Sequence, residues 1–324
     1  MAAQHQAEGA TRRPTPVCAA HRRPGRPRGP GGIMPVRSGG VRTVTVSHSQ
    51  QRSPQQRSTT GASGFGAPCW ASLATRDLAS AQEFYGAVLA WTFRDTELGE
   101  EFSVALSDGV PTAGLGELAA TLHIANDWTP YFAVPDADVA GARIRERSGT
   151  LAVGPIDFPI GRAAIGADRD GARFGIWEGR LVADWQAWRQ HRPWWLDLTT
   201  PNPFEAALFY GEILDWASDR PGCCDVGYEH DDVVLRDEGR VAALITAGAE
   251  KKDTGPGSGP RWNVHFPVRD MEAALEAAAR HGGRVIDRRV SARDDGATLC
   301  DPDGAVFCIA AATSPPHADG IDRM

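Results

Sequence analysis

Two polar side chains in the second half of the chain could form an acid–base pair. Asp197 lies in "WWLDLTT" and His265 lies in "RWNVHFPV", two short segments that read as strands. If both strands present these residues to one site, a carboxylate that holds an imidazole makes a general-base pair near neutral pH. The alternative is that His265 is a hydrogen-bonded structural group, as most single histidines on strands are.

Other residues offer weaker chemistry. Cys308, in the predicted strand "AVFCIA", could be a nucleophile near His265, although a buried cysteine on an apolar strand is usually inert. The sequences "DRDG" (168–171) and "DPDG" (301–304) contain carboxylates that could bind calcium. No ligand loop follows either of them, which favours hairpin turns in which the glycine adopts a positive φ.

An internal duplication positions these residues. The phrase "EFYGAVLAW" at 83–91 returns as "LFYGEILDW" at 208–216, and "FAVPD" at 132–136 returns as "FPVRD" at 266–270. The two D-x-D-G sequences are a third matching pair. A repeat on this scale indicates two domains that share one architecture.

Each copy reads as strand, helix, several strands, and then the same order again. The apolar residues of the repeated phrase recur at three- and four-residue steps, which predicts the packing face of a helix. In the second copy Asn202 is a good N-cap, with Pro203 and Glu205 in the positions that suit a helix start. A later helix in each copy is expected to start at Asp136 or Asp270. The predicted fold class is therefore α+β.

The composition separates the N-terminal residues from the rest. Residues 1–62 hold ten arginines and one acidic residue, so the formal net charge of −7 hides about −16 on the remainder. Their richness in Arg, Pro and Gly predicts disorder. We expect a disordered extension (1–62), a first domain (63–185), a linker (186–193), a second domain (194–313) and a C-terminal tail (314–324).

Charge, hydropathy and cysteine usage exclude several classes of function. An acidic body argues against a nucleic-acid partner, because phosphate contacts need Lys and Arg. No run of eighteen apolar residues occurs, so we expect no membrane span. The six cysteines show no paired spacing, which favours a reducing cytoplasm.

The repeated elements resemble a known superfamily. The order of elements, with "FYGxxLxW" on the first helix and "D-x-D-G" before the last strand, is similar to that of the vicinal oxygen chelate proteins. These are the glyoxalases, bleomycin-resistance proteins and extradiol dioxygenases. The pair "PCWASLATRD" and "PWWLDLTTPN" resembles a two-domain actinobacterial branch of glyoxalase-like proteins or hydroxylases. Over about residues 65–313, the resemblance implies two tandem domains, each of paired βαβββ modules that form a curved mixed sheet around a cleft.

The resemblance also implies a divalent metal, held by His, Glu or Gln from four strands. The matching positions hold other residues: Trp70, Gly114, Thr129 and Gly175 in the first copy, and Trp195, Ala243, Asn263 and Cys308 in the second. Indole, glycine and alanine side chains cannot replace imidazole or carboxylate as metal ligands. We therefore expect no metal at this site and no other cofactor.

An aromatic-lined cleft would remain at these positions, and such a surface is the default site for a small molecule. The expected ligand-binding residues are Trp70, Ser72, Thr129, Tyr131, Trp195, Asn263 and Cys308. The expected catalytic residues are His265 and Asp197, because the first copy has Tyr131 and Ser72 in their places. Trp128 and Trp262 are instead expected in the core, between sheet and helix.

Three hypotheses on function follow. The favoured one is a metal-free protein that binds a small metabolite or drug, as bleomycin-resistance relatives bind without catalysis. The alternative is an enzyme of hydroxylase, lyase or isomerase type that uses Asp197 and His265, or a metal at a relocated site. The third is a scaffold with a degenerate cleft. The two domains could pair within one chain as a monomer, or the protein could form a homodimer.

Overall fold

The computed structural model describes residues 64–218, 224–229, 232–248, 258–290 and 295–312. All of them belong to one compact unit, Arg57–Met324. The predicted N-terminal extension, 1–62, and the predicted tail, 314–324, lie outside the described residues.

Two eight-stranded mixed sheets form the body, one from each copy of the repeat. The first has the strand order β2-β3-β4-β1-β5-β8-β7-β6 and the second β10-β11-β12-β9-β13-β16-β15-β14. The strands of the first sheet are β1 (Pro68–Ala74), β2 (Thr92–Asp95), β3 (Phe102–Ser107), β4 (Val110–Gly116), β5 (Asp127–Ala133), β6 (Thr150–Phe158), β7 (Gly161–Ala167) and β8 (Arg173–Gly179). Those of the second are β9 (Trp195–Thr200), β10 (Asp225–Glu229), β11 (Asp232–Asp237), β12 (Arg240–Ala247), β13 (Arg261–Val268), β14 (Arg284–Val290), β15 (Asp295–Cys300) and β16 (Val306–Ala311). The identical strand orders confirm the tandem α+β fold that the repeat predicted.

The helices begin where the sequence placed their caps. The six helices of the described residues are α1 (Leu78–Leu89), α2 (Ala119–Leu122), α3 (Ala137–Glu146), α4 (Trp185–Gln190), α5 (Pro203–Leu214) and α6 (Met271–Arg280). Asn202 accepts a hydrogen bond from the Glu205 amide, and Asp136 and Asp270 cap α3 and α6 in the same way. None of these helices is long and apolar enough to cross a membrane.

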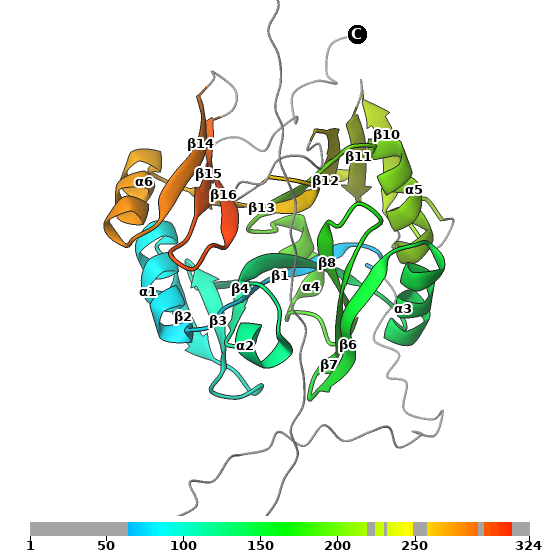
Figure 1. Ribbon diagram of the computed structural model, residues 1–324, viewed down its shortest axis with the longest axis horizontal. Coiled ribbons are helices and arrows are strands. Elements are labelled where there is room, and N and C mark those ends of the chain that lie inside the picture. The colour runs from blue at the N-terminus through cyan, green and yellow to red at the C-terminus, as the bar shows by residue number, and fades with distance from the viewer. Residues whose placement is uncertain (1–63, 219–223, 230–231, 249–257, 291–294, 313–324) are drawn as a thin grey trace, which may run out of the picture. The chain divides into compact units, whose positions relative to one another are not determined.

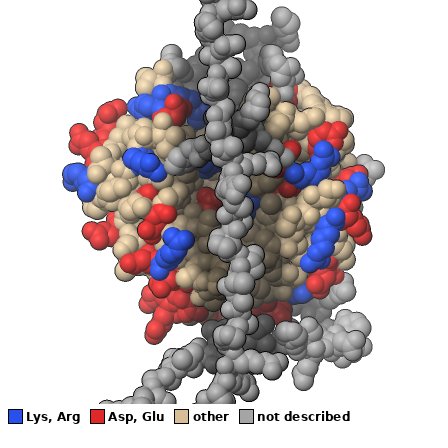
Figure 2. Space-filling view, in the orientation of Figure 1, with Lys and Arg blue, Asp and Glu red and all other residues tan. Residues whose placement is uncertain are grey.

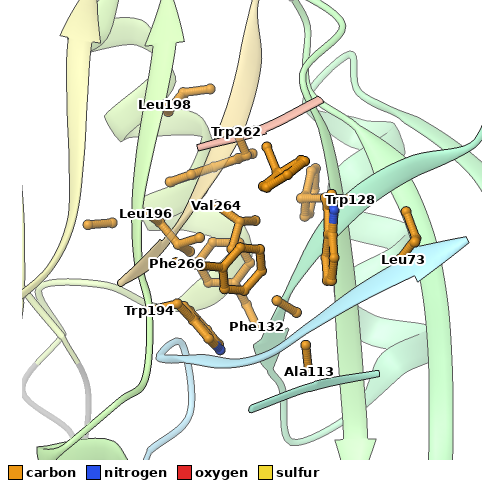
Figure 3. Close-up of a cluster of buried hydrophobic side chains, with 14 of the residues drawn as sticks. Leu73, Ala113, Trp128, Phe132, Trp194, Leu196, Leu198, Trp262, Val264 and Phe266 are labelled. Atoms are coloured by element: carbon orange, nitrogen blue, oxygen red, sulfur yellow. The ribbon is translucent and has the colours of Figure 1, made fainter. Parts of the chain in front are cut away.

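The two sheets pack against one another, with a pair of helices on each side. Helix α1 of the first half lies beside α6 of the second, and α3 lies beside α5, as Figure 1 shows. Strands β5 and β13 meet at the centre, where Phe132 contacts Trp262 and Trp128 contacts Phe266. These rings belong to one core that residues of both sheets share (Figure 3). Burial of Trp128 and Trp262 confirms their predicted place in the core.

A buried hydrogen-bonded group joins the halves on each side of this core. Tyr85 of α1 donates to Asp301 at 3.0 Å and accepts from the Trp128 indole at 2.9 Å. On the other side Tyr210 of α5 donates to Asp168 at 3.0 Å and accepts from the Trp262 indole at 2.8 Å. Each tyrosine thus pairs with an aspartate of the opposite half. The repeated nine-residue sequence therefore provides a contact between the two halves, through Tyr85 and Tyr210, as well as the packing face of a helix.

The same aspartates organise the D-x-D-G turns, which confirms the turn prediction. One carboxylate oxygen of Asp168 accepts the amides of Asp170, Gly171 and Ala172, while the other accepts the Tyr210 hydroxyl. Gly171 has a φ of 102° and Gly304 a φ of 99°, as such turns require. Burial raises the pKa of Asp168, although these hydrogen bonds oppose the shift.

Helix α4 occupies the segment where the sequence predicted a linker. The Trp188 indole donates to the Pro111 carbonyl at 2.9 Å, and the Trp194 indole donates to Thr112 at 2.9 Å, both on β4. Arg189, with a side chain only 1% exposed, pairs with Asp237 of the second sheet. The chain therefore passes between the sheets through a packed helix that is bonded to both.

We expect Tyr85→Phe and Tyr210→Phe each to lower the free energy of unfolding by about 1–3 kcal/mol, because each leaves a buried carboxylate oxygen and an indole N–H without their partner. Tyr228→Phe is the control, since Tyr228 is 60% exposed and its change should cost under about 0.5 kcal/mol. Urea denaturation of the three variants measures the effect. Equal stability of all three would show that the buried hydroxyls contribute nothing.

Candidate functional site

The second sheet brings the two predicted catalytic residues together. Trp195, Asp197 and Thr199 alternate along β9 with the fully buried Leu196 and Leu198, so they lie on the face turned away from the core. On the neighbouring strand β13, His265 pairs in register with Trp195, and Asn263 pairs with Asp197. We call the surface formed by Trp195, Asp197, Asn263, His265 and Cys308 the site face.

Asp197 is the centre of a hydrogen-bond network on the site face. One of its carboxylate oxygens binds Nε2 of His265, and the other accepts from Asn263 at 2.7 Å and from Thr199 at 3.3 Å. Asn263 also donates to the Thr199 hydroxyl at 3.2 Å. The network holds the carboxylate in one orientation, as an acid–base pair requires.

The imidazole lies beneath the indole of Trp195. The two rings are stacked with their centroids 3.5 Å apart and an angle of 16° between their planes. The side chain of His265 is 2% exposed and that of Asp197 15% exposed, while Trp195 and Asn263 are partly exposed. A molecule that approaches the site face would therefore meet Trp195, Asp197 and Asn263 before the imidazole.

The charges of this cluster stabilise one another. Burial lowers the pKa of His265, but the negative charges of Cys308 and Asp197 outweigh it and raise the pKa to about 9. Burial raises the pKa of Asp197, but the charge of His265 and its hydrogen bonds hold that pKa below its usual value. At neutral pH the imidazole therefore carries both protons. It can donate a proton, whereas the sequence had suggested a base near neutral pH.

Cys308 is the third ionisable group of the cluster. It is 2% exposed and is the register partner of His265 on the adjacent strand β16. Its sulfur lies 3.5 Å from the hydroxyl of Thr298 on β15. Burial raises the pKa of this thiol, but the charge and hydrogen bond of His265 outweigh burial, so the pKa lies below its ordinary value.

The corresponding face of the first sheet is covered by its own aromatic side chains. Trp70 pairs in register with Tyr131, and Ser72 pairs with Thr129, in the same arrangement as in the second half. A Cβ atom placed on Gly175 would lie 2.3 Å from the Tyr131 ring, and one on Gly114 would lie 2.8 Å from the Trp70 indole. The predicted ligand-binding residues of the first half thus cover this face, with Thr129 buried at 3% exposure.

The residues present do not fit the metal of the vicinal oxygen chelate fold. In the first half, Trp70 and Tyr131 occupy the space where ligand side chains from Gly114 and Gly175 would stand. Within the described ranges, no three His, Cys, Asp or Glu side chains are placed to share a metal ion. In both halves the donor set therefore disagrees with that of the metal-binding members.

The sequence predicts the second-half counterpart of Gly114 near Ala243. In the structure Gly114 pairs with Ser72, and Leu244 pairs with Asp197, the counterpart of Ser72. Leu244 therefore corresponds to Gly114, and Ala243 belongs to the buried core. A one-residue error in alignment moves a strand residue to the opposite face.

Sequence reasoning missed two hydroxyl groups of the site. Thr199 follows Asp197 by two residues on the same strand, so the alternation already used for Asp197 could have found it. Thr298 lies on β15, which pairs with β16, and only the register Thr298 with Cys308 reveals its position. No local signal in the sequence indicates that register.

Comparison with known proteins agrees with this architecture. A family model described as a glyoxalase-like domain matches residues 195–310. The anthracycline biosynthesis protein DauV of Streptomyces sp. (strain C5) is 30% identical over 280 residues, which are 79% of this chain and 97% of that protein. DnrV of Streptomyces peucetius, also an anthracycline biosynthesis protein, is 28% identical over 75% of this chain and 92% of its own length.

Among solved structures, an extradiol ring-cleaving dioxygenase from B. fuscum is 16% identical, with a TM-score of 0.49 over 82% of this chain and 76% of that chain. The similarity to DauV extends over almost its whole length and includes both halves of the duplication. The chain therefore belongs to the same family as DauV, and its second half matches a glyoxalase-like domain.

Proposed function

We propose that the site face binds a small planar aromatic metabolite without a metal. The observation that carries the proposal is the network of Trp195, Asp197, His265 and Asn263, which only one half of a duplicated protein contains. An indole that is partly exposed offers a surface for stacking, and the carboxylate and amide beside it offer directional polar contacts. In the first half, by contrast, the rings of Trp70 and Tyr131 lie against Gly114 and Gly175 of the same sheet.

The names of the relatives suggest the class of ligand. DauV and DnrV are described as anthracycline biosynthesis proteins. A flat polycyclic aromatic compound of this kind could stack on the indole of Trp195. On the face that Figure 2 shows, basic and acidic side chains are interspersed, without one large basic patch. This distribution favours a small molecule over a nucleic acid.

Proton donation to the ligand is a second candidate function. It is favoured by the pKa of about 9 for His265, since an imidazolium that rests on Asp197 is a proton donor at neutral pH. Because the ring is buried, the ligand would have to reach it beside Trp195 and Asp197. An enzyme of lyase or isomerase type needs such a proton donor next to its substrate.

The charge state of His265 can be measured directly. We expect NMR titration of the His265 ring to give a pKa near 9 in the wild type, and a lower value in Asp197→Asn, which removes one neighbouring negative charge. Because the folded pKa lies above the unfolded value of about 6.5, the contribution of His265 to stability is complete below that pH. It is lost as the pH rises through about 9. A wild-type pKa at or below 6.5 would contradict the assignment.

Ligand binding distinguishes the two halves. We expect a hydroxylated anthraquinone and a commercial anthracycline to raise the melting temperature, and Asp197→Asn and Trp195→Leu to weaken their binding at least tenfold. Ser72→Ala and Trp70→Leu are the matched controls at the corresponding positions of the first half, and calorimetry should show little change for them. Equal loss in both pairs of variants would refute the assignment of the site to the second half.

Binding should not depend on a metal, because Cys308 is the only residue at the superfamily's ligand positions that is a common metal ligand. We expect the same thermal shift with and without a chelator. Elemental analysis of the dialysed protein should find no stoichiometric iron, zinc or nickel. A metal that survives dialysis, together with binding that a chelator abolishes, would replace this proposal with a relocated metal site.

A further inference from the structure

Cys308 differs in its neighbours from Cys69 and Cys300, two other buried cysteines of the described residues. It lies beside an imidazole that is itself bound to a carboxylate, in the order Cys308, His265, Asp197. Cys69 is 3% exposed, and burial strongly raises the pKa of its thiol. Cys300 contacts Arg284 and a backbone carbonyl. Only Cys308, among these, lies beside an imidazole that a carboxylate holds in place.

We propose that Cys308, His265 and Asp197 form a nucleophilic site that adds the cysteine sulfur to the carbon–carbon double bond of an α,β-unsaturated carbonyl compound. A thiolate is the reactive form of cysteine, and an adjacent imidazolium stabilises it. Asp197 holds the imidazole through Nε2, and Asn263 and Thr199 fix Asp197 in turn. The arrangement has the three roles of a nucleophile, a proton carrier and an orienting carboxylate.

The addition is balanced without any further reactant. The sulfur supplies an electron pair that forms a bond to the β-carbon, and the π pair of the double bond moves toward the carbonyl, giving an enolate. The proton of the His265 imidazolium then passes to the α-carbon, and the ring becomes neutral. The product is a thioether of Cys308, and no external oxidant or reductant takes part.

The groups around Cys308 determine the charge of its sulfur and the access of a reactant to it. The charged and titratable groups that act on the sulfur are His265 from β13 and Asp197 from β9, and Arg289 of β14 acts on Asp197. Thr298 of β15 contributes a neutral hydroxyl at 3.5 Å. Because Cys308 is 2% exposed, a reactant must reach it past the partly exposed Thr298 and Asp197. A small, flat electrophile suits this approach.

The identity of the ligand rests on the proposed function, but the reactivity of the thiol does not. N-ethylmaleimide is a small cyclic α,β-unsaturated carbonyl compound and tests the reactivity alone. The full-length native protein is treated at pH 6 to 9, and peptide mass mapping gives the rate at each cysteine. Cys69 is the matched control, since it is equally buried but lacks an imidazole neighbour.

We expect Cys308 to react at least tenfold faster than Cys69 at pH 7. In His265→Gln the rate at Cys308 should fall at least tenfold at pH 7 and should stay low up to pH 9, because burial then raises the pKa of the thiol with no imidazolium to oppose it. Asp197→Asn keeps the ring and provides a second variant if His265→Gln does not fold. A Cys308 that reacts no faster than Cys69, or whose rate is unchanged in both variants, overturns the proposal.

Reversible binding separates the two proposals. In the wild type, calorimetry with the hydroxylated anthraquinone measures recognition by Trp195 and Asp197, while the maleimide rate measures the reactivity of Cys308 alone. Fast maleimide addition without anthraquinone binding would support the nucleophile and refute the proposed ligand class. Anthraquinone binding with an unreactive Cys308 would support the proposed ligand class and refute the nucleophile.

Discussion

The reciprocal hydrogen bonds of Tyr85 to Asp301 and of Tyr210 to Asp168 are the constraint on which the rest of the structure depends. A buried hydroxyl and a buried carboxylate are each costly without a partner, and the carboxylate that accepts each tyrosine hydroxyl comes from the opposite half of the chain. The two halves must therefore pack together in one relative orientation. This requirement explains why tyrosine and aspartate recur in both copies, although neither residue lies on the site face.

The reciprocal arrangement leaves the remaining faces of the two sheets free to differ. The core, the helix pairs and the tyrosine contacts all use the faces that the sheets turn toward one another. On the opposite face of the first sheet, Trp70 contacts Trp188 of α4, which belongs to the core. In the first half Tyr131 lies on Gly175, whereas in the second half the same two positions hold His265 and Cys308. One architecture thus supports a covered surface in one copy and an ionisable cluster in the other.

Most helices and strands could be predicted from the sequence, but few of the contacts between residues far apart in the chain could. Caps such as Asn202 and the spacing of apolar residues are local signals, so helix starts and the strand alternation that pairs Asp197 with His265 could be predicted. The bond from Tyr85 to Asp301 joins residues 216 positions apart, and no periodicity encodes such a contact. The charge of His265 was also out of reach, because it depends on the burial and on the neighbouring Cys308, which only the register of β13 and β16 brings beside it.

The ionisable cluster places a protonated imidazole on the site face, between the carboxylate of Asp197 and the thiol of Cys308. In metal-binding members of this fold, a divalent cation polarises the oxygens of the substrate. Here an imidazolium lies on the corresponding face, held by the carboxylate of Asp197 and shielded by the indole of Trp195. A buried cation of this kind acts at short range in a poorly screened environment, so it can favour an oxygen on which negative charge develops. Under the proposal that this face works without a metal, the protonated His265 supplies part of the electrostatic role that a metal has in other members of the fold.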